Sequence, residues 1–186
     1  FLNQQRSLLA LQKAEKMKKQ AFADRYPYGI FSCIRTMGHI YKSRGNFDLS
    51  AQYYQEALDY MLKNMPDQDP SQLYSSLAEY YRNTQKDYAT ALDYCEKALK
   101  SAKTERNIAQ AMIEKCLVLF RQGRIDEFND CYKEAVQMAD RCKLSASVSL
   151  LIAHISKNIL DKQYEQAHAH ADQLSEEGLQ QHAYIY

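Results

Sequence analysis

A unit of 37 to 41 residues recurs along this chain of 186 residues, and no other feature constrains its fold as strongly. In each copy a turn precedes a helical stretch that ends in a triplet such as "EAL". The copies begin at Gly45, Lys86, Gly123 and Lys162, and one shared position within them holds Ala57, Ala98, Ala135 and Leu174. Repetition at this period is typical of stacked units that are each too small to bury their own apolar face.

A second helical stretch precedes each copy. Its apolar residues fall three and four positions apart, which places them on one face of a helix. The sets are Ile34, Met37, Gly38 and Tyr41; Tyr74, Leu77, Ala78 and Tyr81; Met112, Cys116 and Leu119; Leu151, Ile155 and Ile159. Only five Gly and three Pro occur, which argues against a β-sandwich. The sequence therefore predicts an all-α fold, a right-handed α-solenoid of antiparallel helical hairpins with turns near the four starting residues.

Small residues are expected where the two helices of a hairpin meet, because a large side chain there would push the helix axes apart. In the first helices these positions hold Gly38, Ala78 and Cys116. In the second helices they hold Ser50, Ala91 and Ala167, with Tyr54 and Tyr132 as large partners that fill the remaining space.

The hairpin resembles the tetratricopeptide repeat (TPR), whose fingerprint is W-x2-L-G-x2-Y, then A-x3-F, then P. The first repeat fills these positions with Ile34, Met37, Gly38, Tyr41, Ser50 and Tyr54. The second fills them with Tyr74, Leu77, Ala78, Tyr81, Ala91 and Cys95. The third departs at Lys115 and Phe128, the closing Pro is missing, and the spacing exceeds the usual ~34 residues.

The whole chain, residues 1–186, is interpreted as one such array. Its parts are a helix of a preceding truncated unit (1–22), repeat 1 (27–65), repeat 2 (70–103), repeat 3 (105–142), a degenerate repeat 4 (145–177) and the start of a further helix after a turn at Gly178 (178–186). Because the chain starts on Phe1 and stops without a helix-ending signal, we expect it to be an excerpt of a longer protein.

Motifs for catalysis or cofactor binding do not occur, so a non-catalytic region without a cofactor is expected. There is no G-x-G-x-x-G, G-x-x-x-x-G-K-[ST], H-E-x-x-H or G-x-S-x-G. His168 and His170 would point to opposite sides of a helix, so no metal site is expected. His39 is expected at the surface and His154 at the edge of the core. The five cysteines lack a C-x-x-C motif and fit small buried helix residues.

Charge and hydropathy narrow the range of partners. A formal net charge of +1 creates no strong positive electrostatic field that would attract nucleic acid. The short basic run "EKMKKQ" is typical of a solvent-exposed helix face. No apolar run reaches the ~18 residues that span a bilayer, so no membrane contact by this region is expected.

The TPR resemblance implies that the first helices line a concave groove that takes a protein or peptide segment. The groove positions singled out for a partner are Arg35, His39, Lys42, Glu79, Arg82, Ile113, Leu117, Phe120 and Arg121. Their charges are mostly positive, so the expected partner is an acidic segment whose apolar portion rests on Ile113, Leu117 and Phe120. A solvated groove without a ligand stays open as the alternative. The lysine and arginine clamp by which some TPR modules hold a carboxyl terminus is not reproduced.

Residues 26–58 are similar to the TPR regions of certain bacterial sensor histidine kinases and of TPR–helix-turn-helix regulators. That resemblance implies a sensor or interaction module of a two-component signalling protein. It also implies a location outside the cytoplasmic membrane and a homodimer formed through the parent protein. The alternatives are a cytoplasmic scaffold or adaptor, or the regulatory part of a transcription regulator.

Overall fold

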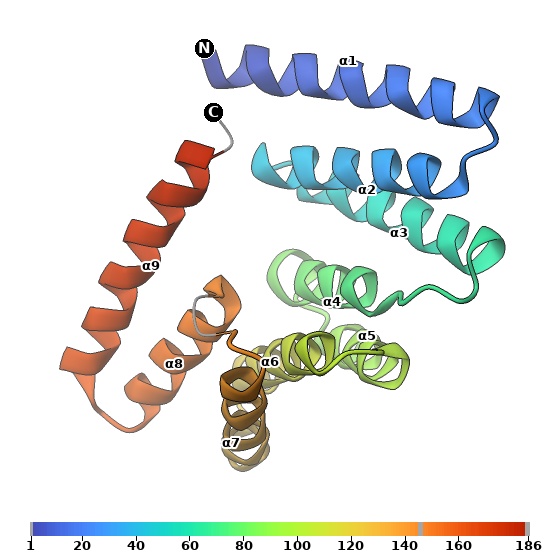
Figure 1. Cartoon of the computed structure of the whole chain (residues 1–186). Helices are drawn as coiled ribbons and strands as arrows, with labels where there is room; N and C mark the ends of the chain where they lie inside the picture. Colours follow the sequence, from blue (N-terminus) through green and yellow to red (C-terminus); the bar gives the residue numbers. More distant parts are fainter. Residues whose placement is uncertain (1, 145–146, 185–186) are drawn as a thin grey trace.

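The computed structural model describes residues 2–144 and 147–184, which form helices joined by short connections, with no strand among them (Figure 1). The helices are α1 (Leu2–Ala23), α2 (Pro27–Ser43), α3 (Phe47–Asn64), α4 (Ser71–Tyr80), a π-helical turn (Tyr81–Gln85), α5 (Tyr88–Ser101), α6 (Glu105–Gln122), α7 (Ile125–Arg141), α8 (Val148–Leu160) and α9 (Tyr164–Tyr184). The all-α solenoid that the sequence predicts is therefore confirmed.

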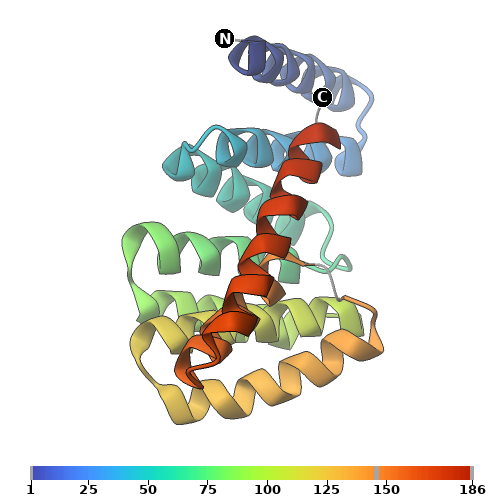
Figure 2. The same cartoon turned by 90° about the vertical axis from the view of Figure 1, so that its left-hand side faces the viewer.

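Four helical hairpins, α2–α3, α4–α5, α6–α7 and α8–α9, stack in chain order. Each hairpin packs on the next, because α3 contacts α4, α5 contacts α6, and the first helices α4, α6 and α8 contact one another in succession. Two large apolar clusters, around α2–α4 and around α6–α8, form the core of the stack. Helix α9 turns back along the array, and its last turns lie on the side of α1 (Figures 1 and 2).

The four expected turns all occur, and each contains a residue with a left-handed backbone. The φ angles are 74° at Gly45, 54° at Lys86, 76° at Gly123 and 59° at Lys162. Such a residue ends a helix because it redirects the chain so that the backbone N–H groups after the helix can donate to the last carbonyl oxygens of the helix. Asn46 and Asp87 then cap the following helices by accepting hydrogen bonds from the backbone N–H groups of Leu49 and Thr90.

The π-helical turn after α4 absorbs one extra residue. Gly38 and Ser50 are 12 positions apart in the first repeat, whereas Ala78 and Ala91 are 13 apart in the second. A π-turn closes its hydrogen bonds over five residues rather than four, so it takes up one residue without breaking the helix. Consistent with this, the backbone N–H of Asp87 donates to the carbonyl oxygen of Tyr81. The small residues of both helices thus keep their contact.

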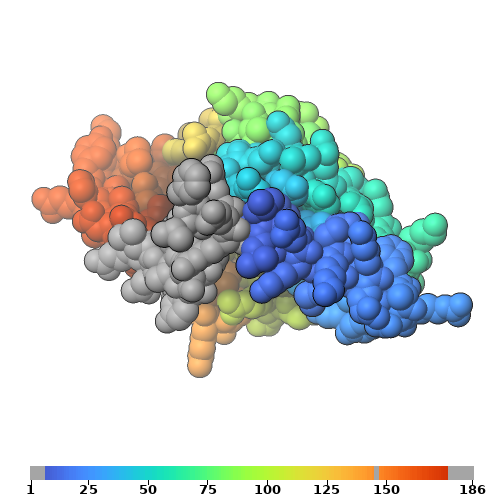
Figure 3. Space-filling view, turned by 90° about the horizontal axis from the view of Figure 1, so that it is seen from above, coloured from blue at the N-terminus to red at the C-terminus, as the bar shows by residue number. Residues whose placement is uncertain are grey.

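Helix α1 packs on α2 at the outer end of the stack (Figure 3). Its sequence places Leu8, Leu11, Ala14 and Met17 on one face, but only Ala14 is buried, and Met17 is 63% exposed. Met17 instead lines an open cleft of about 610 Å³ between α1 and α2.

One expected boundary is wrong. Helix α9 continues through Gly178 to Tyr184, so there is no turn at Gly178 and no new helix begins there. A glycine inside a helix costs about 1 kcal/mol relative to alanine, which the helix formers around it, such as Glu177, Leu179 and Gln180, can offset. Residues 145–146, at the expected start of repeat 4, and residues 185–186 lie outside the described part of the chain.

Candidate functional site

A polar depression of about 170 Å³ follows the first helices of all four hairpins. Helix α2 contributes Arg35 and His39, and α4 contributes the largest share of the wall. The other lining residues are Tyr54, Gln72, Leu73, Ser75, Ser76, Glu79, Gln110, Glu114 and Ser149. Most of these side chains are amides and hydroxyls, which can both donate and accept hydrogen bonds.

A second depression of about 260 Å³ adjoins the first and shares Tyr54, Ser76 and Glu79 with it. Its other lining residues are Lys42, Phe47, Ser50, Tyr80, Asn83 and Thr84. Asn83 and Thr84 belong to the π-helical turn, a kind of segment found often at functional sites. We call the two depressions together the inner groove.

In the wall of the inner groove, the hydroxyl of the buried Tyr54 and Nδ1 of His39 are hydrogen-bonded at 2.9 Å, and the His39 residue is exposed, as expected from the sequence. Burial lowers the pKa of His39, and the nearby cations Arg35 and Lys42 lower it further, against the opposing charge of Glu79. Burial also raises the pKa of Tyr54 to about 12. This pair therefore presents a neutral imidazole and a neutral phenol to the groove.

Two of the expected groove cations are already paired with carboxylates. Lys42 forms an ion pair with Glu79 across the first two repeats. Arg82 is buried, and its Nη2 lies 2.7 Å from Oε1 of Glu114, with both side chains 5% exposed. Burial raises the pKa of the Glu114 carboxyl, while the Arg82 guanidinium acts in the opposite direction. Arg82, which was expected on the groove face, thus lines neither depression, and Glu114 neutralises its charge.

Arg35 differs from Lys42 and Arg82 in having no carboxylate partner among the ion pairs of the described residues. Its guanidinium carbon lies 5.2 Å from the centroid of the Phe31 ring, within cation–π range. Arg121, in the last turn of α6, is exposed, but it lines neither depression of the inner groove. Arg35 is therefore the unpaired positive charge of the inner groove.

The expected apolar anchors face the core instead of the groove. Ile113 and Leu117 are each 1% exposed and belong to the α6–α8 cluster, so they offer no surface to a partner. Phe120 is half-buried against Phe128, with ring centroids 5.5 Å apart. The physical reason is the fourth hairpin: Ile113 and Leu117 belong to the same apolar cluster as Leu150 and Ala153 of α8, which packs on α6.

Sequence reasoning placed Arg35, His39, Lys42 and Glu79 toward the groove, and all four line it. It did not identify Glu114 as a residue that lines the groove. A glutamate inside an apolar helix was a usable signal, because a buried carboxylate needs a partner. The partner, Arg82, lies 32 residues away, which no local pattern reveals.

The histidines beyond the groove form a separate contact between α7, α8 and α9. The Tyr132 hydroxyl lies 2.6 Å from Nδ1 of His154, whose ring stacks on that of His170 at 5.1 Å. His168 points away, with its side chain 82% exposed, as expected for an H-x-H pair on a helix. No cluster of three potential metal ligands occurs among the residues covered by the structure.

The chain was compared with known proteins. Residues 30–104 match the family model of the tetratricopeptide repeat. Among solved structures, the chain is similar to the crystal structure of BtubC (BKLC) from P. vanneervenii, with a TM-score of 0.68 and 17% sequence identity over 94% of this chain and 72% of that chain. No curated protein sequence matches. None of the described helices has the length and apolar character of a membrane-crossing segment. The match over residues 30–104 is to a repeat motif that implies a protein-interaction module.

Proposed function

We propose that this chain is a non-catalytic protein-interaction module that binds an extended segment of a partner protein in its inner groove. The observation that carries the proposal is the lining of the groove. Gln72, Ser75, Ser76, Gln110 and Ser149 provide neutral donors and acceptors from three successive first helices. An extended segment exposes backbone N–H and C=O groups on both sides, and side chains of this kind can pair with them.

The charge of the groove points to one acidic contact rather than a generally acidic partner. Lys42 and Arg82 are already neutralised by Glu79 and Glu114, which leaves Arg35 to meet a carboxylate. A charged group at the rim of an interface affects association rate and salt dependence more than affinity. We therefore expect a mostly polar segment with an acidic residue opposite Arg35, and no apolar anchor on Ile113 or Leu117.

The test is selection of binding peptides from a random library, followed by titration of selected peptides. Ser75→Trp fills the groove with an aromatic side chain, and Glu96→Trp places the same side chain on the exposed face of α5 as a matched control. Ser75→Trp should abolish binding while Glu96→Trp leaves it unchanged. Equal binding by both variants would contradict the proposed site.

The charge contribution is tested separately. Arg35→Glu should slow the association of an acidic selected peptide by roughly tenfold or more, because it replaces an attraction by a repulsion. The matched control is Lys63→Glu, an exposed charge reversal in the last turn of α3. If Arg35→Glu has no larger effect than Lys63→Glu, the partner does not contact Arg35.

We further propose that the module belongs to a bacterial signalling protein of the sensor histidine kinase type. The support is the similarity of residues 26–58 to the TPR regions of such proteins. A scaffold or a transcription regulator is the alternative. The test is the sequence of the parent chain: a membrane-spanning run of about 20 apolar residues beside a kinase core would support the proposal. A DNA-binding domain in its place would contradict it.

A further inference from the structure

Two cysteines face each other across the third hairpin. Cys116 lies on α6 and Cys131 on α7, seven residues before and eight residues after Gly123 in the turn. Their sulfur atoms are 2.8 Å apart. Both thiols are free, and neither is near a potential metal cluster in the described part of the chain.

The distance between the two sulfurs already approaches that of a bond. A disulfide has an S–S length of about 2.05 Å and forms without backbone movement only between favourably placed cysteines. Closing the remaining gap requires the two sulfur atoms to approach by about 0.8 Å. The other three cysteines are placed differently: Cys33 and Cys95 are buried, and Cys142 donates to the carbonyl oxygen of Ala139 at 3.5 Å.

The two thiols also have unequal roles. Cys131 is partly exposed, whereas Cys116 is completely buried. The Cys116 thiol donates a hydrogen bond to the sulfur of Cys131, which lowers the pKa of Cys131, and the charge of Lys115 lowers it further against burial and Glu134. The same hydrogen bond, together with burial, raises the pKa of Cys116. The Cys131 thiol also donates to the carbonyl oxygen of Met112 at 3.5 Å. An accessible thiol of lowered pKa beside a buried thiol of raised pKa is the arrangement of a reactive and a resolving cysteine.

We propose that Cys116 and Cys131 form a dithiol site that hydrogen peroxide oxidises to an intramolecular disulfide. The Cys131 thiolate attacks one peroxide oxygen, the O–O bond breaks, and the departing hydroxide takes a proton to become water. Cys131 is then a sulfenic acid. The Cys116 sulfur attacks the Cys131 sulfur, the S–O bond breaks, and the hydroxide leaves as water with the Cys116 proton. The two thiols lose two electrons in total, which reduce the peroxide to two molecules of water.

The test treats the reduced chain of 186 residues with hydrogen peroxide, alkylates the remaining thiols under denaturing conditions and maps the peptides without reductant. We expect one cross-link, between the peptides that contain Cys116 and Cys131, with Cys33, Cys95 and Cys142 alkylated. Cys142→Ser is the matched control and should give the same cross-link. Cys131→Ser should give none and leave Cys116 reduced.

A second measurement does not depend on any variant. The bond would close a loop between residues 15 apart, so oxidation should raise the Tm of the wild-type chain by roughly 5 to 10 °C. The reductant dithiothreitol should reverse the rise. Over-oxidation of Cys131 without a cross-link, a bond between Cys131 and Cys142, cross-linked dimers, or an unchanged Tm would each overturn the proposal.

Discussion

Arg82 and Glu114 join the second and third repeats through a buried ion pair. Two guanidinium nitrogens of Arg82, Nε and Nη2, lie 2.8 and 2.7 Å from Oε1 of Glu114. A third, Nη1, donates to Oδ1 of Asn83 at 2.8 Å. The π-helical turn supplies both Arg82 and Asn83. The π-helical turn thus has two roles: it takes up the extra residue of the second repeat, and it contains Arg82, the partner of Glu114.

Removing one member of this pair should destabilise the fold strongly. Glu114→Ala leaves the Arg82 charge buried without a partner, which costs about 3–5 kcal/mol. Replacing both residues, as in Arg82→Met/Glu114→Leu, should cost much less than Glu114→Ala, because no charge stays buried. Urea denaturation measures the free energy of unfolding of each variant.

The control for this prediction is Asp93→Asn, which removes an ion pair with Lys97 whose side chains are 58% and 50% exposed. Exposed pairs contribute about 0–1 kcal/mol. If Glu114→Ala is no more destabilising than Asp93→Asn, the buried pair does not hold the two repeats together.

Gly38 permits the close contact between α2 and α3. A Cβ atom added at Gly38 would lie 2.7 Å from Cε1 of Tyr54, well inside van der Waals contact. Ala91 is completely buried at the corresponding contact of the second hairpin. Gly38→Leu and Ala91→Leu should therefore each destabilise the array by about 1–3 kcal/mol or more through overpacking.

Ser43→Leu is the matched substitution for comparison, since Ser43 is exposed at the end of α2 and a larger side chain there can extend into water. Its Tm should stay close to that of the wild type. Equal Tm values for all three variants would show that the assignment of repeat positions is wrong.

Local pattern was sufficient for the fold but not for the site. Gly38 and Ala91 could be assigned from spacing because helix–helix contacts recur at fixed offsets within each repeat. The turns at Lys86 and Lys162 could be placed because the repeat itself located them, although lysine is not a typical turn residue. In contrast, the packing of α8 on α6 buries Ile113 and Leu117 in an apolar cluster, and Glu114 lines the groove and alters its charge.

The interactions between repeats were the part that sequence could not supply. Lys42 pairs with Glu79 at a separation of 37 residues, and Arg82 pairs with Glu114 at a separation of 32. Each charge by itself resembles an ordinary solvated residue. The Cys116–Cys131 contact, by comparison, had a usable signal, because residues at nearly equal distances from a hairpin turn face each other in antiparallel helices.

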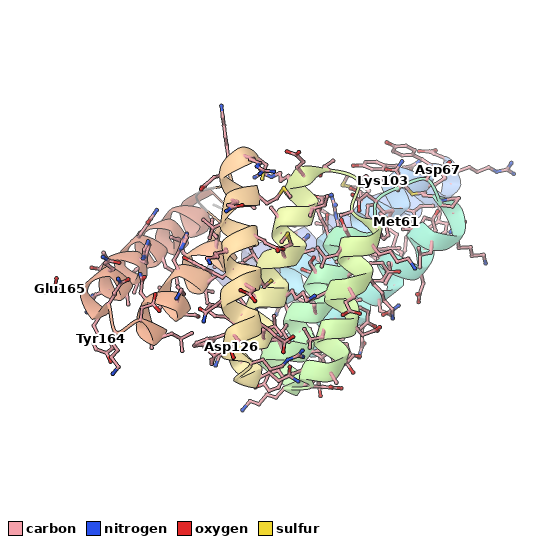
Figure 4. All side chains as sticks on the ribbon, turned by 90° about the horizontal axis from the view of Figure 1, so that it is seen from below. Met61, Asp67, Lys103, Asp126, Tyr164 and Glu165 are labelled. Atoms are coloured by element: carbon pink, nitrogen blue, oxygen red, sulfur yellow. The ribbon has the colours of Figure 1, made fainter. Side chains whose placement is uncertain are left out.

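Asp69 links two connections between hairpins at one end of the array. Its Oδ1 accepts a hydrogen bond from the backbone N–H of Ser71, and its Oδ2 accepts from the backbone N–H of Lys103 and from Nδ2 of Asn107, each at 2.8 to 2.9 Å. The Lys103 side chain donates to the carbonyl oxygen of Asp67, and Figure 4 shows these two residues side by side.

Asp69→Ala should therefore lower the free energy of unfolding by about 1–3 kcal/mol, because it leaves partly buried donors without an acceptor. The nearby Asp67→Ala is the control, because Asp67 is exposed and bonds to Lys103 through its backbone carbonyl. A comparable loss in both variants would indicate a general effect of charge in this loop rather than the Asp69 network.

Two histidine–tyrosine pairs should make the stability of the array depend on pH. His39 bonds to Tyr54 and His154 to Tyr132, and both tyrosines occupy the same repeat position. Burial lowers the pKa of His39, and the charges of Arg35 and Lys42 lower it further, against the charge of Glu79. Burial also lowers the pKa of His154, and His170 lowers it further, against the charge of Asp140.

Since the folded pKa values of His39 and His154 lie below the ordinary histidine pKa of about 6.5, the unfolded chain binds more protons in this range. The stability is therefore fully present above about pH 6.5 and is lost as the pH falls through and below that value. Chemical denaturation between about pH 7.5 and pH 5 should show a falling free energy of unfolding, and His39→Gln and His154→Gln should each flatten that slope. His168→Gln, at a side chain that is 82% exposed, should leave it unchanged. A slope that persists in the double variant His39→Gln/His154→Gln would assign the pH dependence to other groups.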